Sequence, residues 1–415
     1  MVPNGWGKHS VGKICTSIVP GRNKPKVFNG SIPWVTTPEI KGRYIPSKFQ
    51  KNYISLEALK ECGGKTVPNG AVVMAAVGEL GLVAITSEEV VLNQQLHAFV
   101  CSDLVHNEYL AYWLSSQKPF MKSIASKTTI PYLNKTNCES VPVALPPLPE
   151  QQKIATILNT WDKAISTTER LIDNSKQQKK ALMQQLLTGK KCLFDDSGKP
   201  FECEWEDVSL ESISEIMTDY VANGSFQSLR ENVVVTDEVD HSLYVRLTDL
   251  RVGLGHKNQK YTSKKSYDFL KKSCLFGGEL LMANIGANVG EVWQMPEVDM
   301  PATLAPNMLM TKFKPRAHSR YVYYFLSSSF GQNRISKVIA GSGHPKINKT
   351  ELKQVKVLLP SFKEQQKIAA VLTNADKEIQ LVEQQLADLK QEKKALMQQL
   401  LTGKRRVKVD NTEAA

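Results

Sequence analysis

The segment Glu150-Gln-Gln-Lys-Ile-Ala155 opens a stretch of sequence that closes with Lys179-Lys-Ala-Leu-Met-Gln-Gln-Leu-Leu-Thr-Gly-Lys190. The same opening recurs from residue 364, and the same closing segment ends at residue 404. The offset is 364 − 150 = 214 at the start and 404 − 190 = 214 at the end, so the two copies have equal length. A repeat of this size decides the architecture of a chain, and it identifies a tandem duplication.

Both copies carry mostly apolar residues at the a and d positions of a heptad, a pattern typical of long helices that pair. Each copy ends in Thr-Gly followed by lysine, which favours a helix end. Ser361 and Glu364 have capping-box spacing, and Pro149 suits a first helical turn. We predict an antiparallel coiled coil, with two core helices of one domain as the alternative. The predicted seam residues are Ile154, Leu158, Trp161, Ile165, Thr168, Ile172, Ser175, Lys179, Leu182 and Leu186, then Ile368, Leu372, Ala375, Ile379, Val382, Leu386, Leu389, Lys393, Leu396 and Leu400.

Lys179 and Lys393 occupy equivalent positions in this apolar seam. A polar seam residue can fix the register of a coiled coil or mark a docking surface. A lysine can also extend its ammonium past its aliphatic stem into water. We favour this second interpretation for both lysines.

The sequence outside the two helices has the size of ordinary domains. The predicted boundaries are a globule at 1–145, a helical spacer at 146–191, a linker at 192–204, a second globule at 205–358, a second helical spacer at 359–404 and a flexible tail at 405–415. Buried strands are predicted at 71–77 and 280–285, and amphipathic helices at 107–116 and 319–329. The predicted fold class is two mixed α/β, or α+β, globules joined by two long helices, with a pseudo-two-fold internal repeat.

The globules share an outline but little sequence. Their ends correspond at the 214-residue offset, because Pro131-x-x-Asn134-Lys135-Thr136 matches Pro345-x-x-Asn348-Lys349-Thr350. Their starts also correspond, since Trp6 and Trp205 each precede a similar apolar segment. The repeated Asn-Lys-Thr suggests either helix capping or phosphate contact, and we favour capping. Copied helices with diverged globules predict one shared architectural role and two separate recognition roles.

The chain has a net charge of +12 and a pI near 9.2, which favours an anionic partner, above all nucleic acid. A merely soluble basic protein is the alternative. The seven cysteines are odd in number and form no Cys-x-x-Cys pair, so neither a disulfide framework nor a zinc site is predicted. No amino-terminal signal or long apolar run is present in the sequence, which predicts a cytoplasmic protein.

Sequence motifs for catalysis are missing. Gly63-Gly64-Lys65-Thr66 resembles the end of a phosphate-binding loop, but Leu59 stands where that motif requires glycine. The histidines show no metal-ligand spacing, and no nucleophile elbow or Asn-Pro-Pro-aromatic loop occurs. We therefore predict no enzyme activity, and no catalytic, cofactor-binding or metal-binding residues.

Two similar segments lead into the two predicted long helices. They are Leu-Pro-Pro-Leu-Pro-Glu-Gln-Gln-Lys-Ile-Ala at 145–155 and Leu-Pro-Ser-Phe-Lys-Glu-Gln-Gln-Lys-Ile-Ala at 359–369. Because of these two segments and the alternation of globules and helices, nearly the whole chain resembles the specificity subunit of type I restriction–modification systems. Ile32-Pro33-Trp34-Val35-Thr36-Thr37-Pro38 also resembles that family's early target-recognition segment. The second globule offers only the looser match Tyr244-Val245-Arg246-Leu247-Thr248-Asp249-Leu250.

This resemblance implies a non-catalytic reader of double-stranded DNA. Each globule would be a target recognition domain for one half of a bipartite target, and the coiled coil would set the spacing and dock two modification (methyltransferase) subunits. Restriction subunits would add translocation and cleavage. S-adenosylmethionine, ATP and Mg would belong to these partner subunits, and none to this chain. The competing hypotheses are a coiled-coil structural adaptor with non-specific anion binding and an enzyme with an unrecognised site.

Polar and basic side chains in both globules are candidates for phosphate contacts and base-edge contacts. Ordinary solvated surface is the alternative for each of them. The candidates in the first globule are Arg22, Asn23, Lys24, Lys41, Arg43, Lys127, Thr128, Thr129, Asn134 and Lys135. Those in the second are Arg246, Thr248, Arg251, Lys257, Asn258, Lys260, Asn284, Asn288, His344, Lys346, Asn348 and Lys349.

Overall fold

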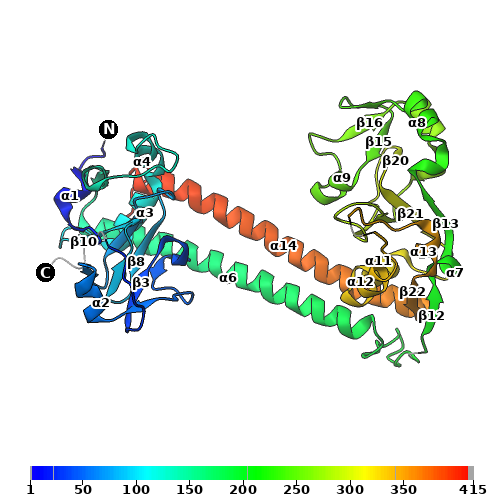
Figure 1. Ribbon diagram of the computed structural model, residues 1–415, viewed down its shortest axis with the longest axis horizontal. Coiled ribbons are helices and arrows are strands. Elements are labelled where there is room, and N and C mark those ends of the chain that lie inside the picture. Colours follow the sequence, from blue (N-terminus) through cyan, green and yellow to red (C-terminus); the bar gives the residue numbers. More distant parts are fainter. Residues whose placement is uncertain (1, 22, 203, 342, 410–415) are drawn as a thin grey trace. The chain divides into compact units, whose positions relative to one another are not determined.

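The computed structural model describes residues 2–21, 23–202, 204–341 and 343–409, and the chain divides into two compact units (Figure 1). The first unit comprises Met1–Arg170 and Gln384–Ala415, and the second comprises Leu171–Glu383. Helix α6 covers Leu148–Leu186 and helix α14 covers Phe362–Leu401, so each helix contributes to both units. The predicted fold class, two mixed α/β domains with two long helices, is confirmed.

The first unit contains a central sheet of strand order β2-β10-β7-β8-β4 and a second sheet of order β5-β3-β9-β6. Strands β1 and β11 pair separately, antiparallel to one another. Its elements are β1 Gly7–Ser10, α1 Val11–Ile14, β2 Cys15–Ile18, β3 Ile32–Val35, η1 Thr37–Glu39, β4 Tyr44–Ile45, β5 Tyr53–Ile54, α2 Leu56–Glu61, β6 Thr66–Val67, β7 Val72–Ala75, β8 Val83–Thr86, β9 Val90–Leu92, β10 Leu96–Cys101, α3 Asn107–Ser116, α4 Lys118–Ile124, α5 Lys135–Glu139 and β11 Pro142–Leu145.

The second unit repeats this plan with sheets of order β13-β21-β18-β19 and β14-β16-β15-β20-β17, and a separate β12-β22 pair. Its elements are β12 Glu206–Ser209, α7 Leu210–Ile213, β13 Ser214–Asp219, η2 Tyr220–Asn223, α8 Phe226–Asn232, β14 Val235–Thr236, β15 Ser242–Val245, α9 Leu247–Val252, β16 Lys260–Thr262, α10 Lys264–Phe269, η3 Lys271–Ser273, β17 Cys274–Leu275, β18 Leu280–Ala283, β19 Val292–Gln294, β20 Ala302–Leu304, β21 Met308–Phe313, α11 Ser319–Ser327, α12 Ser329–Ser336, α13 Lys349–Gln354 and β22 Lys356–Leu359.

Two predicted strands and two predicted helices are present. The all-apolar runs form β7 and β18, whose residues are fully buried because both faces of these strands are covered. Helix α3 has the predicted ends, and α11 ends two residues early because the Ser328 hydroxyl caps the next helix, α12. Asn134 and Asn348 cap α5 and α13 through Asn137 N–H and Glu351 N–H, each at 2.8 Å, so the capping interpretation of the repeated triplet is confirmed.

Alternation along β7 places its side chains in two different cores. Val72 and Met74 face a core that includes α3 and Ile154 of α6, whereas Val73 and Ala75 pack against the second sheet. The second unit does the same, because Leu280 and Met282 join a core with α11 and both long helices. The ends of α6 and α14 are therefore part of the hydrophobic cores of the globules.

In the first unit the beginning of α6 runs antiparallel to the end of α14. Asp162 pairs with Lys393 at 2.5 Å and Glu169 pairs with Lys390 at 2.7 Å, so residue numbers rise along one helix as they fall along the other.

Both helices end near the predicted Thr-Gly, and Gly189 and Gly403 adopt the positive φ that glycine tolerates.

In the second unit the end of α6 pairs with the beginning of α14 in the same sense, through Lys176–Glu383 at 2.7 Å and Lys179–Asp376 at 2.5 Å. All the predicted seam positions are buried or half-buried. The interpretation that Lys179 and Lys393 extend into water is wrong, because each ammonium is held by an aspartate of the opposite helix.

Among the cysteines that the structure describes, Cys192 departs from the sequence prediction. Cys192 is disulfide-bonded, whereas Cys15, Cys62, Cys101, Cys138 and Cys274 are free thiols. In the described part of the chain, no helix is both long and apolar enough to cross a membrane.

Candidate nucleic-acid interface and helix seam

A buried glutamine in each repeated Glu-Gln-Gln fixes the start of a long helix to its globule. Gln151 is fully buried; its Oε1 accepts from His106 N–H at 2.8 Å, and its Nε2 donates to the carbonyls of Leu104 and Pro146 at 2.9 and 2.8 Å. His106 immediately precedes α3, so the glutamine satisfies a backbone group at that helix start.

Gln365 makes the corresponding contacts in the second unit, with His318 N–H at 2.8 Å and the Arg316 and Pro360 carbonyls at 3.1 and 2.8 Å. This explains the identical phrase in both copies, because a buried amide must have all its partners in place. The sequence signal was its exact repetition, although the periodicity alone did not identify Gln151 or Gln365 as buried.

A tyrosine of each globule joins the two long helices at the seam. Tyr112 Oη donates to Asp162 at 2.5 Å, and the same aspartate binds the ammonium of Lys393. That ammonium lies 5.2 Å from the centre of the Tyr112 ring, within reach of a cation–π contact. Burial is the main cause that raises the pKa of Tyr112.

Tyr324, Asp376 and Lys179 repeat this arrangement in the second unit, with an Oη–Oδ2 distance of 2.7 Å and the ammonium 5.4 Å from the ring centre. We call each Tyr–Asp–Lys group a seam joint. Sequence reasoning missed both aspartates and both tyrosines, because none of them lies on an a or d position.

Two surface loops meet in each unit through matched backbone hydrogen bonds. In the first unit Gly78 N–H donates to Pro131 O at 2.9 Å, and Leu133 N–H donates to Ala76 O at 2.8 Å. In the second unit the corresponding bonds are Gly286 N–H to Pro345 O at 3.0 Å and Ile347 N–H to Asn284 O at 2.8 Å. We call residues 76–81 with 126–133, and the described residues of 284–290 with 340–347, the paired loops.

The paired loops have the same scaffold but different side chains. Lys127, Thr128, Thr129 and Ile130 are exposed in the first unit, whereas Asn288, His344 and Lys346 are exposed in the second. Asn284 replaces Ala76 at the same backbone position, and its Oδ1 is buried with no hydrogen-bond partner among the described residues. A shared scaffold with different exposed groups is what two readers of different sequences require.

Several other predicted DNA-contacting residues already bind within the protein. Arg43 pairs with Glu108 at 2.6 Å and stacks 3.4 Å from the centre of the Tyr112 ring. Further ion pairs join Arg251 to Glu291, Lys260 to Asp237, Lys349 to Asp219 and Lys135 to Glu139.

Arg246 holds the start of α9 through Asp249, which is fully buried. Burial opposes ionisation of Asp249, but hydrogen bonds from Arg246 and His256 outweigh it and hold the pKa of that carboxyl below its usual value. Arg246 is thus used to build the α9 turn.

The remaining candidates in the described part of the chain have no side-chain ion pair there, and all of them except the half-buried Asn284 are exposed. Arg22 lies outside the described residues. Asn23, Lys24 and Lys41 lie away from the paired loops in sequence, whereas Arg251 connects α9 to Glu291 at the end of one such loop. Apart from the capping residues Asn134 and Asn348, the exposed candidates of this group beyond the paired loops are Asn23, Lys24, Lys41, Thr248, Lys257 and Asn258.

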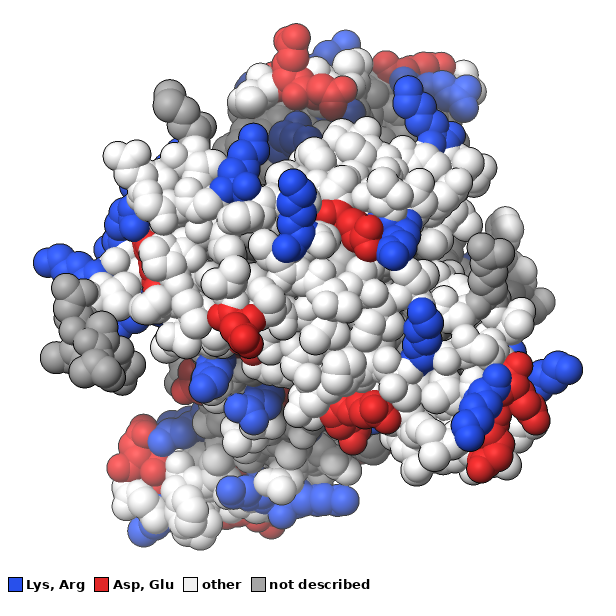
Figure 2. Space-filling model, turned by 90° about the vertical axis from the view of Figure 1, so that its left-hand side faces the viewer, with Lys and Arg blue, Asp and Glu red and all other residues white. Residues whose placement is uncertain are grey.

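Charge is scattered on the face of the molecule shown in Figure 2. Lysine and arginine side chains stand apart from each other on it, with acidic side chains between them. Among the residues that the structure describes, no group of histidine, cysteine or acidic side chains could hold a metal ion. On the face shown in Figure 2, the basic side chains do not form one continuous patch.

Comparison with known proteins identifies the family. The family described as type I restriction modification DNA specificity domain matches residues 3–175 and 203–391. The specificity subunit of the type I restriction enzyme MjaVIII of Methanocaldococcus jannaschii is 29% identical over 314 residues, which cover 72% of this chain and 70% of the relative. The MjaIX specificity subunit of the same organism is 28% identical over 209 residues, or 49% of this chain and 46% of the relative.

Two solved structures share the fold. The S subunit of the type I restriction-modification system from M. genitalium has a TM-score of 0.56 at 12% identity, covering 96% of this chain and 97% of that one. A chain from a study of complex assembly and conformational transition of the type I R-M system has a TM-score of 0.59 at 17% identity, covering 98% and 100%. The chain therefore belongs to the type I restriction–modification DNA specificity family, as a non-catalytic specificity subunit with two target recognition domains.

Proposed function

We propose that the two target recognition domains read the two halves of a bipartite DNA target, and that α6 and α14 set the spacing and seat two modification subunits. The repetition of the seam joint carries this proposal. The same Tyr–Asp–Lys contacts fasten the helices in both units, so the two globules are attached in equivalent ways. A fixed attachment is what half-site spacing requires, because that spacing is a geometric property of the protein.

The paired loops are the proposed base-reading elements. Lys127 and Lys346 would contact phosphates, whereas Thr129, Asn288 and His344 would face base edges. Their scaffold is common to both units and their exposed side chains differ. Different loops on one scaffold allow the two half-targets to have different sequences.

We propose the protein partners from the family, and DNA from both the family and the net charge of the chain. Methylation would use S-adenosylmethionine bound by the modification subunits, and restriction subunits would use ATP and Mg. The specificity subunit contributes the choice of target. We propose that this assembly acts in the cytoplasm, where the DNA is.

Mapping of methylated adenines tests the proposal. Genomes are compared with and without this chain, and then with residues 340–347 replaced by another sequence of equal length. We expect a bipartite methylation motif that depends on the chain, and a change confined to one half of the motif after replacement. A motif that is not bipartite, or that changes in both halves, would contradict it.

The second candidate function is a structural adaptor that binds anions without reading sequence, and the net charge of +12 is the observation that favours it. In that case replacement of 340–347 leaves the methylation pattern unchanged.

A further inference from the structure

The two long helices begin in matched surroundings that differ in one charge. In the first unit the carboxylate of Glu150 is buried and accepts from Trp6 Nε1 at 3.0 Å. The guanidinium of Arg406 binds both oxygens of this carboxylate, at 2.7 and 2.8 Å, and also donates to Asn4 O at 3.0 Å. A buried carboxylate is thus neutralised by an arginine that follows the end of α14.

Glu364 occupies the matching position in the second unit, with 2% of its surface exposed. The residue that corresponds to Arg406 is Cys192, because 406 − 214 = 192, and it carries no guanidinium. Glu364 Oε1 and Trp205 Nε1 are both buried, and neither has a hydrogen-bond partner among the described residues. A buried carboxylate oxygen without a partner is costly, so the surroundings of Glu364 favour a cationic partner.

The environment of Glu364 supports this conclusion. Burial raises the pKa of Glu364, as expected for a carboxylate that has no neutralising cation beside it. In the first unit the buried carboxylate of Glu150 is neutralised, because Arg406 supplies the opposite charge.

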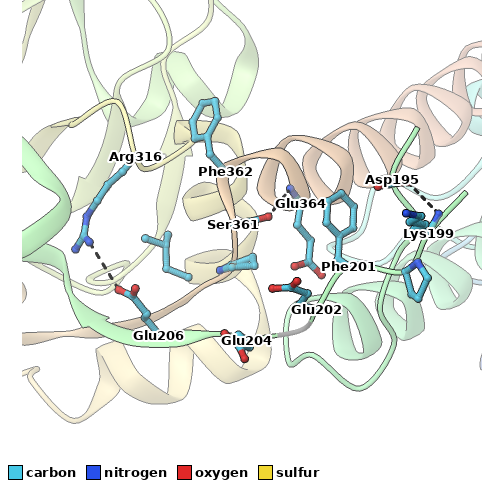
Figure 3. Close-up of a pocket in the computed structure, with 13 residues that line it drawn as sticks. Asp195, Lys199, Phe201, Glu202, Glu204, Glu206, Arg316, Ser361, Phe362 and Glu364 are labelled. Carbon is cyan, nitrogen blue, oxygen red and sulfur yellow. Dashed lines mark hydrogen bonds and ion pairs between the residues drawn. The ribbon is translucent and has the colours of Figure 1, made fainter. Parts of the chain in front are cut away.

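Glu364 lines an open cavity of about 580 Å³ beside the first turn of α14 (Figure 3). Its carboxylate points towards Phe201 and Glu202, which come from the linker after α6. Arg316 lies on the wall of this cavity, and its Nη1 is 3.7 Å from Oε2 of Glu206. The charged lining residues are Asp195, Glu202, Glu204, Glu206 and Glu364, with Lys199 and Arg316. In a chain of net charge +12 this cavity is locally acidic, so it disfavours DNA and favours a cation.

The shape of the site favours a polypeptide side chain over a free ion. The described residues provide no metal-binding group of side chains, whereas the matched site in the first unit holds a guanidinium. Phe362, 40% exposed, lines the cavity and offers an apolar surface for an arginine stem. A second cavity of about 640 Å³ shares Asp195 and Phe201 and extends along α14 to Ala370, which gives room for a protein segment.

We propose that the cavity at the start of α14 is the docking site for an arginine side chain presented by a protein partner, with Glu364 as its anchor. The identity of that partner rests on the proposed function, under which it is a modification subunit. The corresponding site in the first unit is already closed by Arg406. The two helix starts therefore differ in what they offer a partner, although their sequences match.

Binding of purified modification subunit to the full chain tests the proposal, with Glu364→Gln and the matched variant Glu150→Gln. We expect Glu364→Gln to weaken binding at least tenfold while changing the Tm of the chain alone by less than about 2 °C. Glu150→Gln should lower the Tm by several degrees, because Arg406 loses its partner. Unchanged affinity in Glu364→Gln, or an affinity loss matched by a similar fall in Tm, would overturn the docking site.

Titration of the full chain with N-acetyl-arginine amide tests the site without a partner. The fluorescence of Trp205 reports binding, and Trp205→Phe identifies its part of the signal. We expect saturable binding in the wild type that is lost in Glu364→Gln and kept in Glu150→Gln. Absence of saturable binding would contradict the site's chemistry. Failure of the wild type to bind modification subunit, with the arginine amide still bound, would refute the proposed function alone.

Discussion

The ammonium of Lys393 lies 2.5 Å from Oδ1 of Asp162, and Lys179 repeats this pair with Asp376 at the same distance. In both cases the aspartate also accepts a hydrogen bond from a tyrosine of the globule. Each joint therefore connects three elements, namely two long helices and a recognition domain. Loss of one member leaves the other two with unmatched charge or hydrogen-bonding groups.

A double-mutant cycle of Lys393→Met and Asp162→Asn measures the first seam joint. Both side chains are partly exposed, so we expect a coupling free energy of about 1 kcal/mol in urea unfolding. Lys179→Met with Asp376→Asn should give a similar value. Additive effects of the two substitutions would show that the pair does not hold the helices.

Gln151→Ala should destabilise the first unit by about 2–3 kcal/mol, because it leaves the His106 N–H and two buried carbonyls without partners. Gln152→Ala is the matched control, since its side chain is exposed on the same turn. Its effect should remain within about 0.5 kcal/mol. Chemical unfolding of both variants measures the difference, and equal losses would contradict the assigned role of Gln151.

A fragment of residues 1–191 should form a dimer. The end of α6 has the same sequence as the end of α14, so Asp162 of one copy can bind Lys179 of the other in place of Lys393. Analytical ultracentrifugation checks this, and Asp162→Lys should weaken the dimer. With modification subunits we expect methylation of a palindrome of the first half-target. A monomeric fragment would refute the equivalence of the two helix ends.

The stability of the first unit should depend on pH through His97. Burial lowers the pKa of His97 to about 4 in the folded protein, and its Nε2 lies 2.6 Å from Ser17 Oγ. Between pH 6.5 and about 4 the unfolded chain binds a proton that the folded chain does not, so stability falls as the pH falls. The free energy of unfolding falls by about 3 kcal/mol in total across this pH range. The difference in unfolding free energy between wild type and His97→Gln should shrink through this window; a constant difference would exclude the effect.

Phosphate contacts by the paired loops should appear in the salt dependence of DNA binding. Lys127→Ala and Lys346→Ala should each reduce the slope of log K against log salt by about 0.9. Lys8→Ala, exposed on β1 outside the paired loops, provides a control. Fluorescence anisotropy with the assembled methyltransferase measures the slopes. Slopes equal to that of Lys8→Ala would remove both lysines from the interface.

Long-range architecture could be predicted from the sequence because duplication and heptad periodicity report it directly. The buried strands β7 and β18 were predictable as well, since an uninterrupted apolar run has few other uses. The seam joints were not predictable. The partner of Lys393 depends on the antiparallel register and on Tyr112, which comes from a separate part of the chain.

The residues of the candidate DNA interface could be predicted from the sequence only in part. Sequence reveals that Arg43 and Arg246 carry charge, but not that Glu108 and Asp249 already bind them. Contacts within the folded chain, whether distant in sequence as for Arg43 or local as for Arg246, decide which cations are available to DNA. The paired loops are recognisable only once backbone hydrogen bonds bring residues such as Gly78 and Pro131 together.

The core of the first unit includes Leu400 and Leu401, and Val407 packs against it with Val2. Arg406 also donates to Asn4 O at 3.0 Å. A ribosome makes Val2 and Asn4 long before it makes residues 400–407. Part of the apolar surface of the first recognition domain must therefore stay uncovered until residues 400–407 have been made.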